Sequence, residues 1–485
     1  KKEIPVDLDE LLKVEGIGTK TAKLLYKELD IKNLDDLEKA AKDEKIRNLE
    51  GMGEKSEKDI LHGLELLKKS KGRVLLGFIL PVAENLKEKL NNVKEVDDLK
   101  IAGSYRRRKE TVGDLDILVT SEDPKKVMDE FVNLDNVEET ISKGKTKSSV
   151  RIEEGLQVDL RAVKKKSFGS ALLYFTGSKE HNIALRQVAQ KQNMKLSEYG
   201  LFKNGNFKAG RTEKSVYKKL GLSFIPPELR ENRGEVEASQ KNNIPDLVNK
   251  RDIRGDLQMH SKYSDGKNSI KDMVGKAKNL GYDYIAITDH VGSLQIANAM
   301  DNKTIKKQWT EIDKLNKGNF KIFKGAEVDI KGDGLLYIDD EIIKKLDIVL
   351  VSIHHKFKMN EKNMTERICK ALENKYVNIF AHPLTRMIGK REPIDADWEK
   401  IFECAKDNNV ALEINSYPNR LDLPDTYVKK AKEMGCKIAI NTDSHSKEHL
   451  EYMNLGVSTA RRGWLEKKDV INTKTSKQLE KFLTN

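Results

Sequence analysis

Two similar segments open the chain, and in both of them apolar positions recur at helical spacing on either side of a glycine pair. They are residues 11–29, LLKVEGIGTKTAKLLYKEL, and residues 46–64, IRNLEGMGEKSEKDILHGL. Each segment reads as an apolar helix, a G-x-G turn, and the start of a second helix that bears Lys and Ser or Thr. The pattern therefore predicts two helical hairpins.

Residues 72–161 change to an alternation of helices with short apolar strands. The candidate strands are LKIAGSY, DLDILV and LQVDLRAV. Helical periodicity returns over 178–192, and a glycine-interrupted, hairpin-like region follows as far as residue 221. The polar stretch 228–250 ends in a Pro-containing turn and is predicted to be a linker.

From residue 252 onward, short apolar strands alternate regularly with helical segments. The candidate strands are DLQMH, YIAITDH, KIFKGAEVDI, IVLVSIHH, NIFAHP, ALEIN and KIAINTDSH. This alternation predicts a parallel, barrel-like βα fold. Seven of the nine histidines fall in this part, most of them at the C-terminal ends of strands, where barrel enzymes carry their chemistry.

Length and composition indicate a globular protein with several cores. A chain of 485 residues is expected to form two to four domains of roughly 100 to 200 residues each. No segment approaches the roughly 20 apolar residues that span a bilayer, so we expect no membrane partner. The three cysteines, Cys369, Cys404 and Cys436, form no CxxC pair, which favours a reducing cytoplasm.

Positive charge is concentrated in one part of the chain. The net charge is +12, and residues 151–219 contain 15 Lys and Arg against 6 Asp and Glu. A basic stretch of this kind suits a polyanion such as nucleic acid. Charge alone is equally compatible with a solvated, lysine-rich surface.

The glycine pairs of the two hairpins are candidate DNA contacts. They are Gly16 with Gly18 and Gly51 with Gly53. Glycine lets a backbone approach a phosphate closely, and the following helix start offers unpaired N–H groups. A lone G-x-G is more often a plain turn, but two copies with matching flanks favour helix-hairpin-helix units that hold a nucleic-acid backbone without reading bases.

A group of three aspartates is the first candidate metal site. Asp114 and Asp116 project from one face of the strand DLDILV, because alternate strand residues share a face. A third carboxylate, Asp159, lies among apolar neighbours in LQVDLRAV, where an unpaired charge is costly. D-x-D alone is common at strand ends, but the combination G-S-x-R-R-x(6)-D-x-D with a further strand Asp indicates a two-ion Mg²⁺ or Mn²⁺ site.

With these residues, and with LLYFTGSKEHNIALR and FIPPELRENRGE further along, residues 11–235 resemble family X DNA polymerases of the DNA polymerase beta-like nucleotidyltransferase superfamily. The resemblance implies that Asp114, Asp116 and Asp159 are the catalytic metal ligands. It also implies a nucleotide site, made of Gly103, Ser104, Arg107, Gly113, Tyr174, Phe175, Gly177, Lys179 and Asn182, and a template contact at Arg186.

Within this resemblance, Ser104 and Arg107 match the phosphate-binding residues, and Tyr174, Phe175 and Gly177 line the sugar. Lys179 departs from the family, because the animal relative has an acidic residue there. The added positive charge is expected to tighten nucleotide binding. The first residues, KKEIPVDLDELL, lack an initiator Met and a signal peptide, so we expect a fragment, and lyase activity is not carried over.

The histidine-rich part is the second candidate metal site. Six groups, DLQMHSKYSDG, AITDH, KGAEVD, SIHH, AHP and NTDSH, close successive apolar strands, and imidazoles mixed with carboxylates suit Zn²⁺, Mn²⁺ or Fe²⁺. The series resembles a PHP (polymerase and histidinol phosphatase) domain, a distorted (βα)7 barrel with up to three ions. The ligands it implies are His260, Asp265, His290, Glu327, His354, His382, Asp443 and His445. The family motif opens H-x-H, whereas this chain has Gln258 at its first position, which puts metal occupancy there in question.

We expect the chain to be a multidomain enzyme that acts as a monomer in the cytoplasm, with gapped or primed double-stranded DNA and dNTP as its substrates. The expected domains are 1–71 (helix-hairpin-helix), 72–163 (palm, an α+β nucleotidyltransferase domain), 164–235 (thumb), 236–252 (linker) and 253–485 (PHP). The main hypothesis is a gap-filling polymerase with a Mn²⁺-dependent 3′–5′ exonuclease or end-processing phosphoesterase. The alternatives are a polymerase with a structural PHP domain, a nucleotidyltransferase acting on RNA or small molecules, and a non-catalytic DNA-end-binding module.

Overall fold

The computed structural model describes residues 11–12, 14, 17–69, 72–153, 155–292 and 297–484. The chain divides into two compact units. The first comprises residues 1–73 with 385–394, and the second comprises 74–384 with 395–485.

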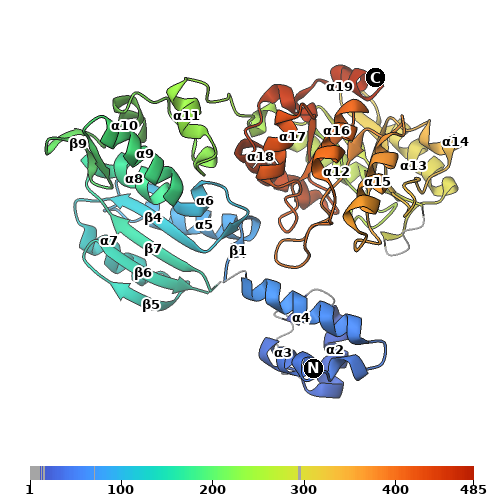
Figure 1. Ribbon diagram of the computed structural model, residues 1–485, viewed down its shortest axis with the longest axis horizontal. Coiled ribbons are helices and arrows are strands. Elements are labelled where there is room, and N and C mark those ends of the chain that lie inside the picture. Colours follow the sequence, from blue (N-terminus) through green and yellow to red (C-terminus); the bar gives the residue numbers. More distant parts are fainter. Residues whose placement is uncertain are drawn as a thin grey trace. The chain divides into compact units, whose positions relative to one another are not determined.

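The first unit is helical, as the sequence predicts, although part of the first predicted hairpin lies outside the described residues and the segment before the second glycine pair is a 3₁₀ turn. Its elements are α2 (Thr19–Leu29), α3 (Leu34–Lys42), the 3₁₀ turn η1 (Ile46–Asn48) and α4 (Glu54–Lys69). Its core includes Leu25, Leu37, Ile46 and Ile60, and its helices α2, α3 and α4 are labelled in Figure 1. The two glycine pairs precede equivalent helices, since Gly18 is the N-cap of α2 and Gly53 directly precedes α4.

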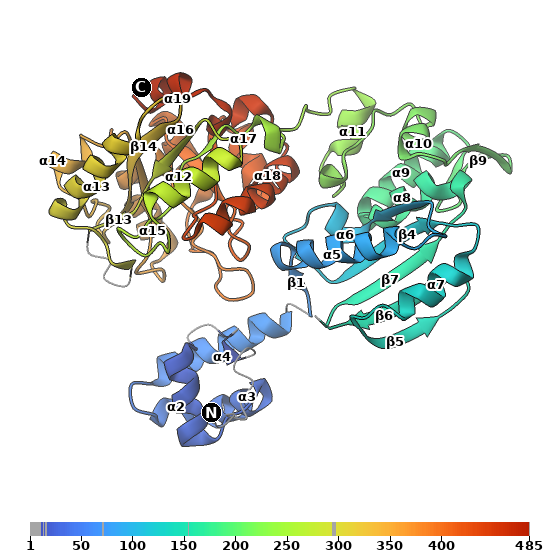
Figure 2. The same ribbon diagram turned by 180° about the vertical axis from the view of Figure 1, so that it is seen from behind.

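A five-stranded sheet carries the aspartates in the second unit. Its strands, in spatial order, are β2 (Asp98–Ile101), β4 (Asp114–Thr120), β7 (Gln157–Ala162), β6 (Lys147–Ile152) and β5 (Val137–Lys143). β4 and β7 are parallel neighbours, and the other pairs are antiparallel. The associated elements are β1 (Val74–Leu75), α5 (Leu76–Asn91), α6 (Gly103–Arg106), β3 (Thr111–Val112) and α7 (Pro124–Val132), with α7 lying along one face of the sheet (Figure 2).

Helical and hairpin segments follow the sheet as expected. They are η2 (Lys165–Ser167), α8 (Phe168–Thr176), α9 (Lys179–Lys191), the antiparallel strands β8 (Lys195–Ser197), β9 (Gly200–Lys203) and β10 (Asn206–Ala209), α10 (Glu213–Lys219) and η3 (Pro227–Leu229). The predicted helix 178–192 corresponds to α9 with its two caps. The Ser178 side chain accepts the backbone N–H of His181, which fixes the start of this helix.

The stretch predicted as a linker is partly helical. Residues Glu235–Gln240 form α11. Its first residue, Glu235, is buried, accepts the backbone N–H groups of Asn232 and Arg233, and pairs with the buried His181 at 2.7 Å. These bonds fold a polar sequence onto α9, and the hydrophobic pattern alone does not reveal them.

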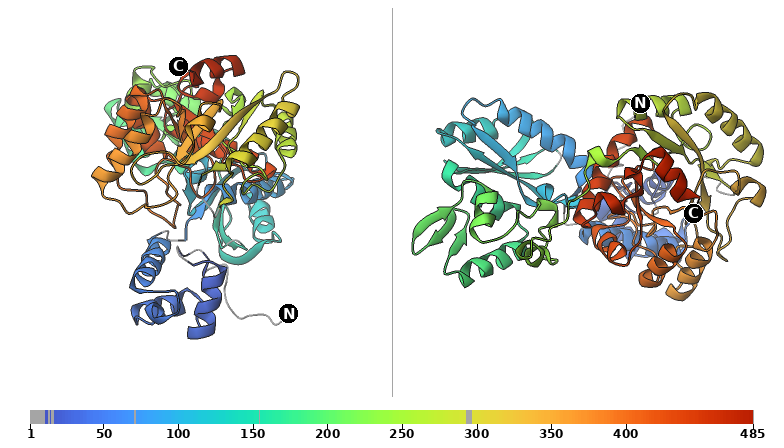
Figure 3. Two further views of the ribbon diagram at one scale, coloured as in Figure 1. Left: turned by 90° about the vertical axis from the view of Figure 1, so that its right-hand side faces the viewer. Right: turned by 90° about the horizontal axis from the view of Figure 1, so that it is seen from above.

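The remainder of the second unit forms a nearly closed parallel barrel of seven main strands, with helices outside them (Figure 3). The strands are β11 (Gly255–Asp256), β12 (Tyr284–Ile287), β14 (Lys321–Asp329), β15 (Ile348–Ser352), β16 (Ile379–Phe380), β17 (Ala411–Asn415) and β18 (Ile438–Asn441), with β13 (His290–Val291) pairing to β14. A parallel bridge between Met259 and Ser444 brings the first and last strands together. The expected barrel is confirmed.

The barrel helices and turns follow the strands in alternation. They are η4 (Lys250–Asp252), α12 (Ile270–Asn279), α13 (Asn302–Leu315), α14 (Asp340–Ile343), α15 (Glu361–Leu372), α16 (Trp398–Asp407), α17 (Asp425–Glu433), η6 (Lys447–Tyr452), α18 (Met453–Arg462), η7 (Lys467–Asp469), η8 (Ile471–Thr473) and α19 (Ser476–Leu483). A disulfide joins Cys369 of α15 to Cys404 of α16, whose Cα atoms are 5.7 Å apart. Cysteine spacing did not predict this pair. Within the described ranges, no helix is long and apolar enough to cross a membrane.

Candidate metal centres and nucleotide pocket

The three predicted aspartates lie near the N-terminal ends of the neighbouring strands β4 and β7. Asp116 of β4 is directly opposite Asp159 of β7 in the parallel register, and Asp114 precedes Asp116 on the same face of β4. Leu115 and Ile117 point to the other face and are fully buried. Strand alternation and strand pairing together therefore place three carboxylates side by side.

The carboxylate of Asp116 is disfavoured in its ionised form by burial and by its two acidic neighbours. Burial, followed by the charges of Asp114 and Asp159, raises the pKa of Asp116 to about 6. Gly103 approaches it closely, with a positive φ of 62°, and a Cβ at that position would lie 2.7 Å from Oδ2 of Asp116. Only glycine allows this close approach.

The negative charge of Asp159 is better compensated than that of Asp116. It accepts a hydrogen bond from Gln157 Nε2 at 2.9 Å and lies 3.4 Å from Lys147 Nζ. Burial alone raises the pKa of Asp159, but Gln157, Ser149 and Lys147 outweigh it and lower that pKa. Asp159 is therefore held ionised next to a neighbour that resists ionisation, and a divalent cation would neutralise both.

The predicted phosphate-binding residues lie beside the aspartates. Ser104 is in α6, Arg107 directly follows that helix, and Gly113 directly precedes β4. The Arg107 guanidinium donates from Nη1 to the Thr176 carbonyl at 2.5 Å and from Nε to Glu231 at 3.0 Å. The main chain leaving α8 and the segment after η3 thus both fix the direction of this arginine.

The predicted sugar-contacting residues end α8. Tyr174 and Phe175 pack edge to face at 5.1 Å, and the Arg161 guanidinium lies 4.7 Å from the Phe175 ring centroid. Asn182 donates its side-chain amide to the Tyr174 carbonyl at 2.7 Å.

Two further predicted contacts, Lys179 and Arg186, are exposed on α9. Gly177 adjoins Arg107, because a Cβ at Gly177 would lie 3.0 Å from its Nη1. The structure therefore brings the nucleotide residues to one region, and their individual roles remain predictions.

The glycines of the hairpins are open to solvent where they are described. A Cβ built at Gly18, Gly51 or Gly53 meets no atom within 4 Å, and Gly51 has a positive φ of 75°. Gly16 lies outside the described residues. Open space in front of these backbones is what a phosphate contact requires.

The eight predicted PHP ligands all meet at the C-terminal ends of the barrel strands. Glu327 of β14 is at the centre of one side, with its Oε1 3.0 Å from His382 Nε2 and its Oε2 3.2 Å from His260 Nε2. His354 Nε2 lies 3.4 Å from the same Oε1. His260 Nε2 also lies 3.1 Å from Oδ1 of Asp443.

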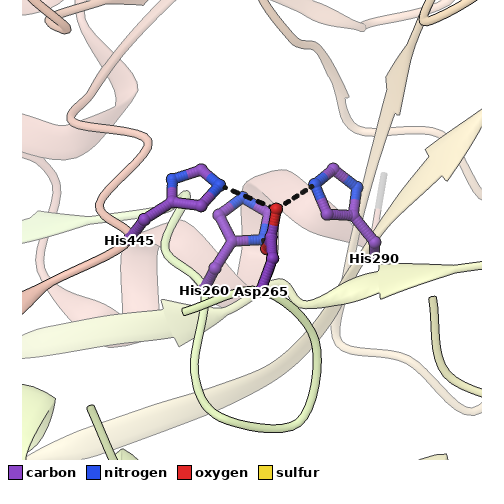
Figure 4. A group of neighbouring side chains, drawn as sticks. All are labelled: His260, Asp265, His290 and His445. Carbon is purple, nitrogen blue, oxygen red and sulfur yellow. Dashed lines mark ion pairs between the residues drawn. The ribbon is translucent and has the colours of Figure 1, made fainter. Parts of the chain in front are cut away.

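Asp265 is at the centre of the other side. Its Oδ2 lies 3.3 Å from His445 Nε2 and 3.9 Å from His290 Nε2, and the His260 ring lies between those of His290 and His445 (Figure 4). Three overlapping groups can each hold an ion: His260, Asp265, His290 and His445; His290, Glu327 and His354; and His260, Glu327 and Asp443.

The donor set fits divalent metal ions. It mixes imidazole nitrogen with carboxylate oxygen, as Zn²⁺, Mn²⁺ and Fe²⁺ prefer. The ligand atoms of each group lie within 4.8 Å of one another. His260 and His382 are buried, and each leaves its Nδ1 without a hydrogen-bond partner.

Gln258 stands where the family motif has its first histidine. Its Nε2 donates to Glu327 Oε2 at 2.9 Å, while its buried Oε1 has no hydrogen-bond partner. The amide N–H therefore occupies an oxygen of Glu327 that a metal ion would otherwise share. The effect of this contact on metal occupancy remains a prediction.

Sequence reasoning missed a layer of buried acids behind these ligands. Glu413 accepts the His382 backbone N–H at 2.7 Å, Asp289 accepts from Ser261, Ser264 and Gln308, and Asp256 accepts from Thr442. Burial raises the pKa of Asp256 to about 7. Asp289 directly precedes His290 in AITDH, so a search for acids next to the histidine motifs would have found it, whereas Glu413 lies in ALEIN, which contains no histidine.

Four family descriptions match successive parts of the chain. They are a SAM-like helix-hairpin-helix tandem (residues 8–65), the DNA polymerase beta palm (80–187), the DNA polymerase beta thumb (171–231) and the PHP domain (256–417).

Among curated proteins, the DNA polymerase/3′-5′ exonuclease PolX of Bacillus subtilis is 41% identical over 489 residues, which cover 100% of this chain and 85% of that protein. A probable phosphatase of Caldanaerobacter subterraneus is 30% identical over 192 residues, which cover 37% of this chain and 70% of that protein. A Leishmania infantum polymerase beta structure, a ternary P/T complex, matches 46% of this chain and 97% of its own at 24% identity and a TM-score of 0.31, which is too low to support an argument.

The fold and its two carboxylate-rich centres thus define a polymerase beta-like nucleotidyltransferase joined to a PHP barrel. The chain belongs to the family X DNA polymerases that carry a PHP domain.

Burial of Asp116, together with repulsion from Asp114 and Asp159, predicts that its charge destabilises the metal-free protein. Because its folded pKa of about 6 exceeds the ordinary value of 3.8, the ionised carboxylate costs about 2 to 3 kcal/mol above that pH, and this cost disappears as the pH falls towards 4. Asp116→Asn should therefore raise the melting temperature in EDTA at pH 8 but not at pH 4. The control is Asp98→Asn, exposed on β2. A lower melting temperature for Asp116→Asn at pH 8 would contradict this account.

Proposed function

We propose that this chain fills short gaps in DNA during repair by two-metal-ion nucleotidyl transfer, and that its PHP domain removes or trims 3′ ends. One observation carries the proposal: the chain aligns over its whole length with a polymerase/exonuclease. The register of Asp116 with Asp159 in the palm and the groups of possible metal ligands in the barrel agree with it. The DNA substrate is gapped or primed, the nucleotide substrate is a dNTP, and the enzyme works as a cytoplasmic monomer.

In the polymerase reaction, Asp114, Asp116 and Asp159 hold two Mg²⁺ or Mn²⁺ ions. When bound, these ions favour attack by the primer 3′-hydroxyl and stabilise charge on the leaving pyrophosphate. Ser104 and Arg107 bind the triphosphate next to Gly103, whose lack of a side chain leaves room for both residues. These residues therefore orient the nucleotide and stabilise the charge that develops during the reaction.

Selection of the nucleotide and template follows from the end of α8 and from α9. Tyr174 and Phe175 contact the sugar and disfavour a ribose hydroxyl, while Asn182 contacts the base edge. Lys179 adds positive charge near the nucleotide, and Arg186 contacts the template strand.

DNA is held mainly through its backbone. The hairpin glycines present open main chain to phosphates, and the basic segment 151–219 adds long-range attraction. Such contacts are insensitive to sequence, and their strength falls as salt rises. The five segments 1–71, 72–163, 164–235, 236–252 and 253–485 are proposed as the functional divisions, and α11 begins at the last residue of the third and continues into the fourth.

The hairpin role predicts a specific defect for Gly53→Val. The new side chain enters open space without positive-φ strain, unlike one at Gly51, so it blocks a phosphate without unfolding the unit. The dissociation constant for gapped DNA should rise about tenfold, as expected for losing one or two charge-assisted backbone contacts, while KM for dNTP stays constant. Gly275→Val, at an exposed helix position with open space, is the control. Unchanged DNA affinity in folded Gly53→Val protein would remove this role.

In the PHP domain, the eight ligands hold up to three Mn²⁺, Zn²⁺ or Fe²⁺ ions. When bound, such ions activate a water molecule and bind the scissile phosphate. Gln258 is an oxygen donor where a histidine is usual, so the preference shifts towards Mn²⁺. The rival proposal is a catalytically silent PHP scaffold, which Gln258 favours, whereas the retention of so many buried charged ligands favours activity.

The two centres should be separable by mutation. Asp159→Asn should abolish dNTP incorporation and leave Mn²⁺-dependent primer degradation intact, because only the palm loses a ligand. His382→Ala should do the reverse. Both activities can be followed on one gapped, 5′-labelled substrate with and without dNTP. The PHP proposal fails, and the scaffold alternative holds, if wild-type protein degrades no primer in Mn²⁺ and His382→Ala changes only thermal stability.

A further inference from the structure

Arg462, the last residue of α18 in the barrel, makes most of its polar contacts outside the barrel. Its side chain is 5% exposed. It pairs with Asp425 of α17 at 2.6 Å, but it also donates to Glu231 at 3.0 Å and to the backbone carbonyl of Arg107 at 2.7 Å. A buried guanidinium is tolerated only when it is fully paired. This charge is therefore paired partly by the polymerase half.

Glu231 connects two arginines. Its Oε1 accepts from Arg107 Nε at 3.0 Å and from Arg462 Nη1 at 3.0 Å. Burial alone raises the pKa of Glu231, but Arg462 and Arg107 outweigh it and hold that pKa below the ordinary value. The carboxylate is thus ionised, and its charge is divided between the two guanidinium groups.

This division matters because Arg107 is the proposed triphosphate ligand. Its Nε and Nη1 are held by Glu231 and by the Thr176 carbonyl, so Nη2 is the nitrogen that the site offers to a phosphate. A carboxylate that paired with Arg107 alone would neutralise it and compete with the nucleotide. Arg462 shares the negative charge of Glu231 with Arg107, and it also donates a hydrogen bond to the backbone carbonyl of Arg107.

We propose that Arg462 is a positioning residue for nucleotide incorporation, through which the PHP domain keeps Arg107 available to the dNTP triphosphate. The inference rests on the proposed role of Arg107. It assigns the PHP domain a contribution to polymerisation that is independent of its own metal cluster.

The neighbouring Arg461 distinguishes this role from simple attachment of the two halves. Arg461 also makes polar contacts outside the barrel: it donates hydrogen bonds to Glu228 at 2.8 Å and to the Val248 carbonyl at 3.1 Å. Neither partner is bonded to Arg107. Arg461→Gln therefore breaks an ion pair of the same kind without changing the charge around the nucleotide pocket.

The test is steady-state gap filling by the full chain, with KM for dNTP and KM for gapped DNA measured separately. Arg462→Gln should raise KM for dNTP about tenfold, the usual effect of losing a charge-assisted hydrogen bond, with KM for DNA unchanged within about twofold. Arg461→Gln should change neither constant. Arg462→Lys, which keeps the charge but loses the forked geometry, should give an intermediate KM and serves if the glutamine variant does not fold.

A double variant tests the route of the effect. Adding Glu231→Gln to Arg462→Gln removes the charge that competes for Arg107, so KM for dNTP should fall below that of Arg462→Gln alone. A purely structural role predicts a further loss instead.

Three results would overturn the inference: an unchanged KM for dNTP in folded Arg462→Gln, an equal rise in Arg461→Gln, or a double variant worse than the single one. Arg107→Gln separates the two proposals. If it raises KM for dNTP and Arg462→Gln does not, only the inference fails. If Arg107→Gln has no effect, the nucleotide-site assignment fails and the inference fails with it.

Discussion

Carboxylates that are buried and brought together at the ends of parallel strands are the constraint on which both centres depend. In the palm, the register of β4 and β7 places Asp116 opposite Asp159, and burial adds to the cost of their charge. In the barrel, Glu327 of β14 and Asp443, which follows β18, come from strands that are not neighbours, and both lie against His260. Groups that repel or lose solvation when the protein folds need a compensating partner, and divalent cations provide one at each centre.

The barrel compensates its charges more fully than the palm. Each central acid, Glu327 or Asp265, lies close to several imidazoles, and outer acids such as Glu413 fix the backbone of the ligands. In the palm, Gln157, Ser149 and Lys147 compensate Asp159, but Arg161 and Lys147 leave the pKa of Asp116 raised. The palm is therefore the centre that should depend on ions arriving with the nucleotide, and the barrel the one that should retain ions between turnovers.

Local patterns predicted much of this architecture. Strand alternation in DLDILV placed Asp114 and Asp116 on one face, and helical spacing gave α9 almost to the residue. Contacts between positions that are distant in sequence could not be predicted. The burial of Glu235 against His181, the Cys369–Cys404 pair, and the bonds of Arg462 to Glu231 each join positions that are distant in sequence and carry no local signal.

Metal content tests the central claim most directly, because it measures charge compensation without depending on activity. Protein loaded with Mn²⁺ and passed through a desalting column would be analysed by mass spectrometry for bound metal. Wild type and Asp159→Asn should retain equal amounts of Mn²⁺, Asp443→Asn should lose most of it, and Gln258→His should retain more than wild type, because an imidazole replaces the amide that occupies Glu327. If Asp443→Asn retains as much metal as wild type, or if wild type retains none, compensation of these carboxylates by bound ions is contradicted.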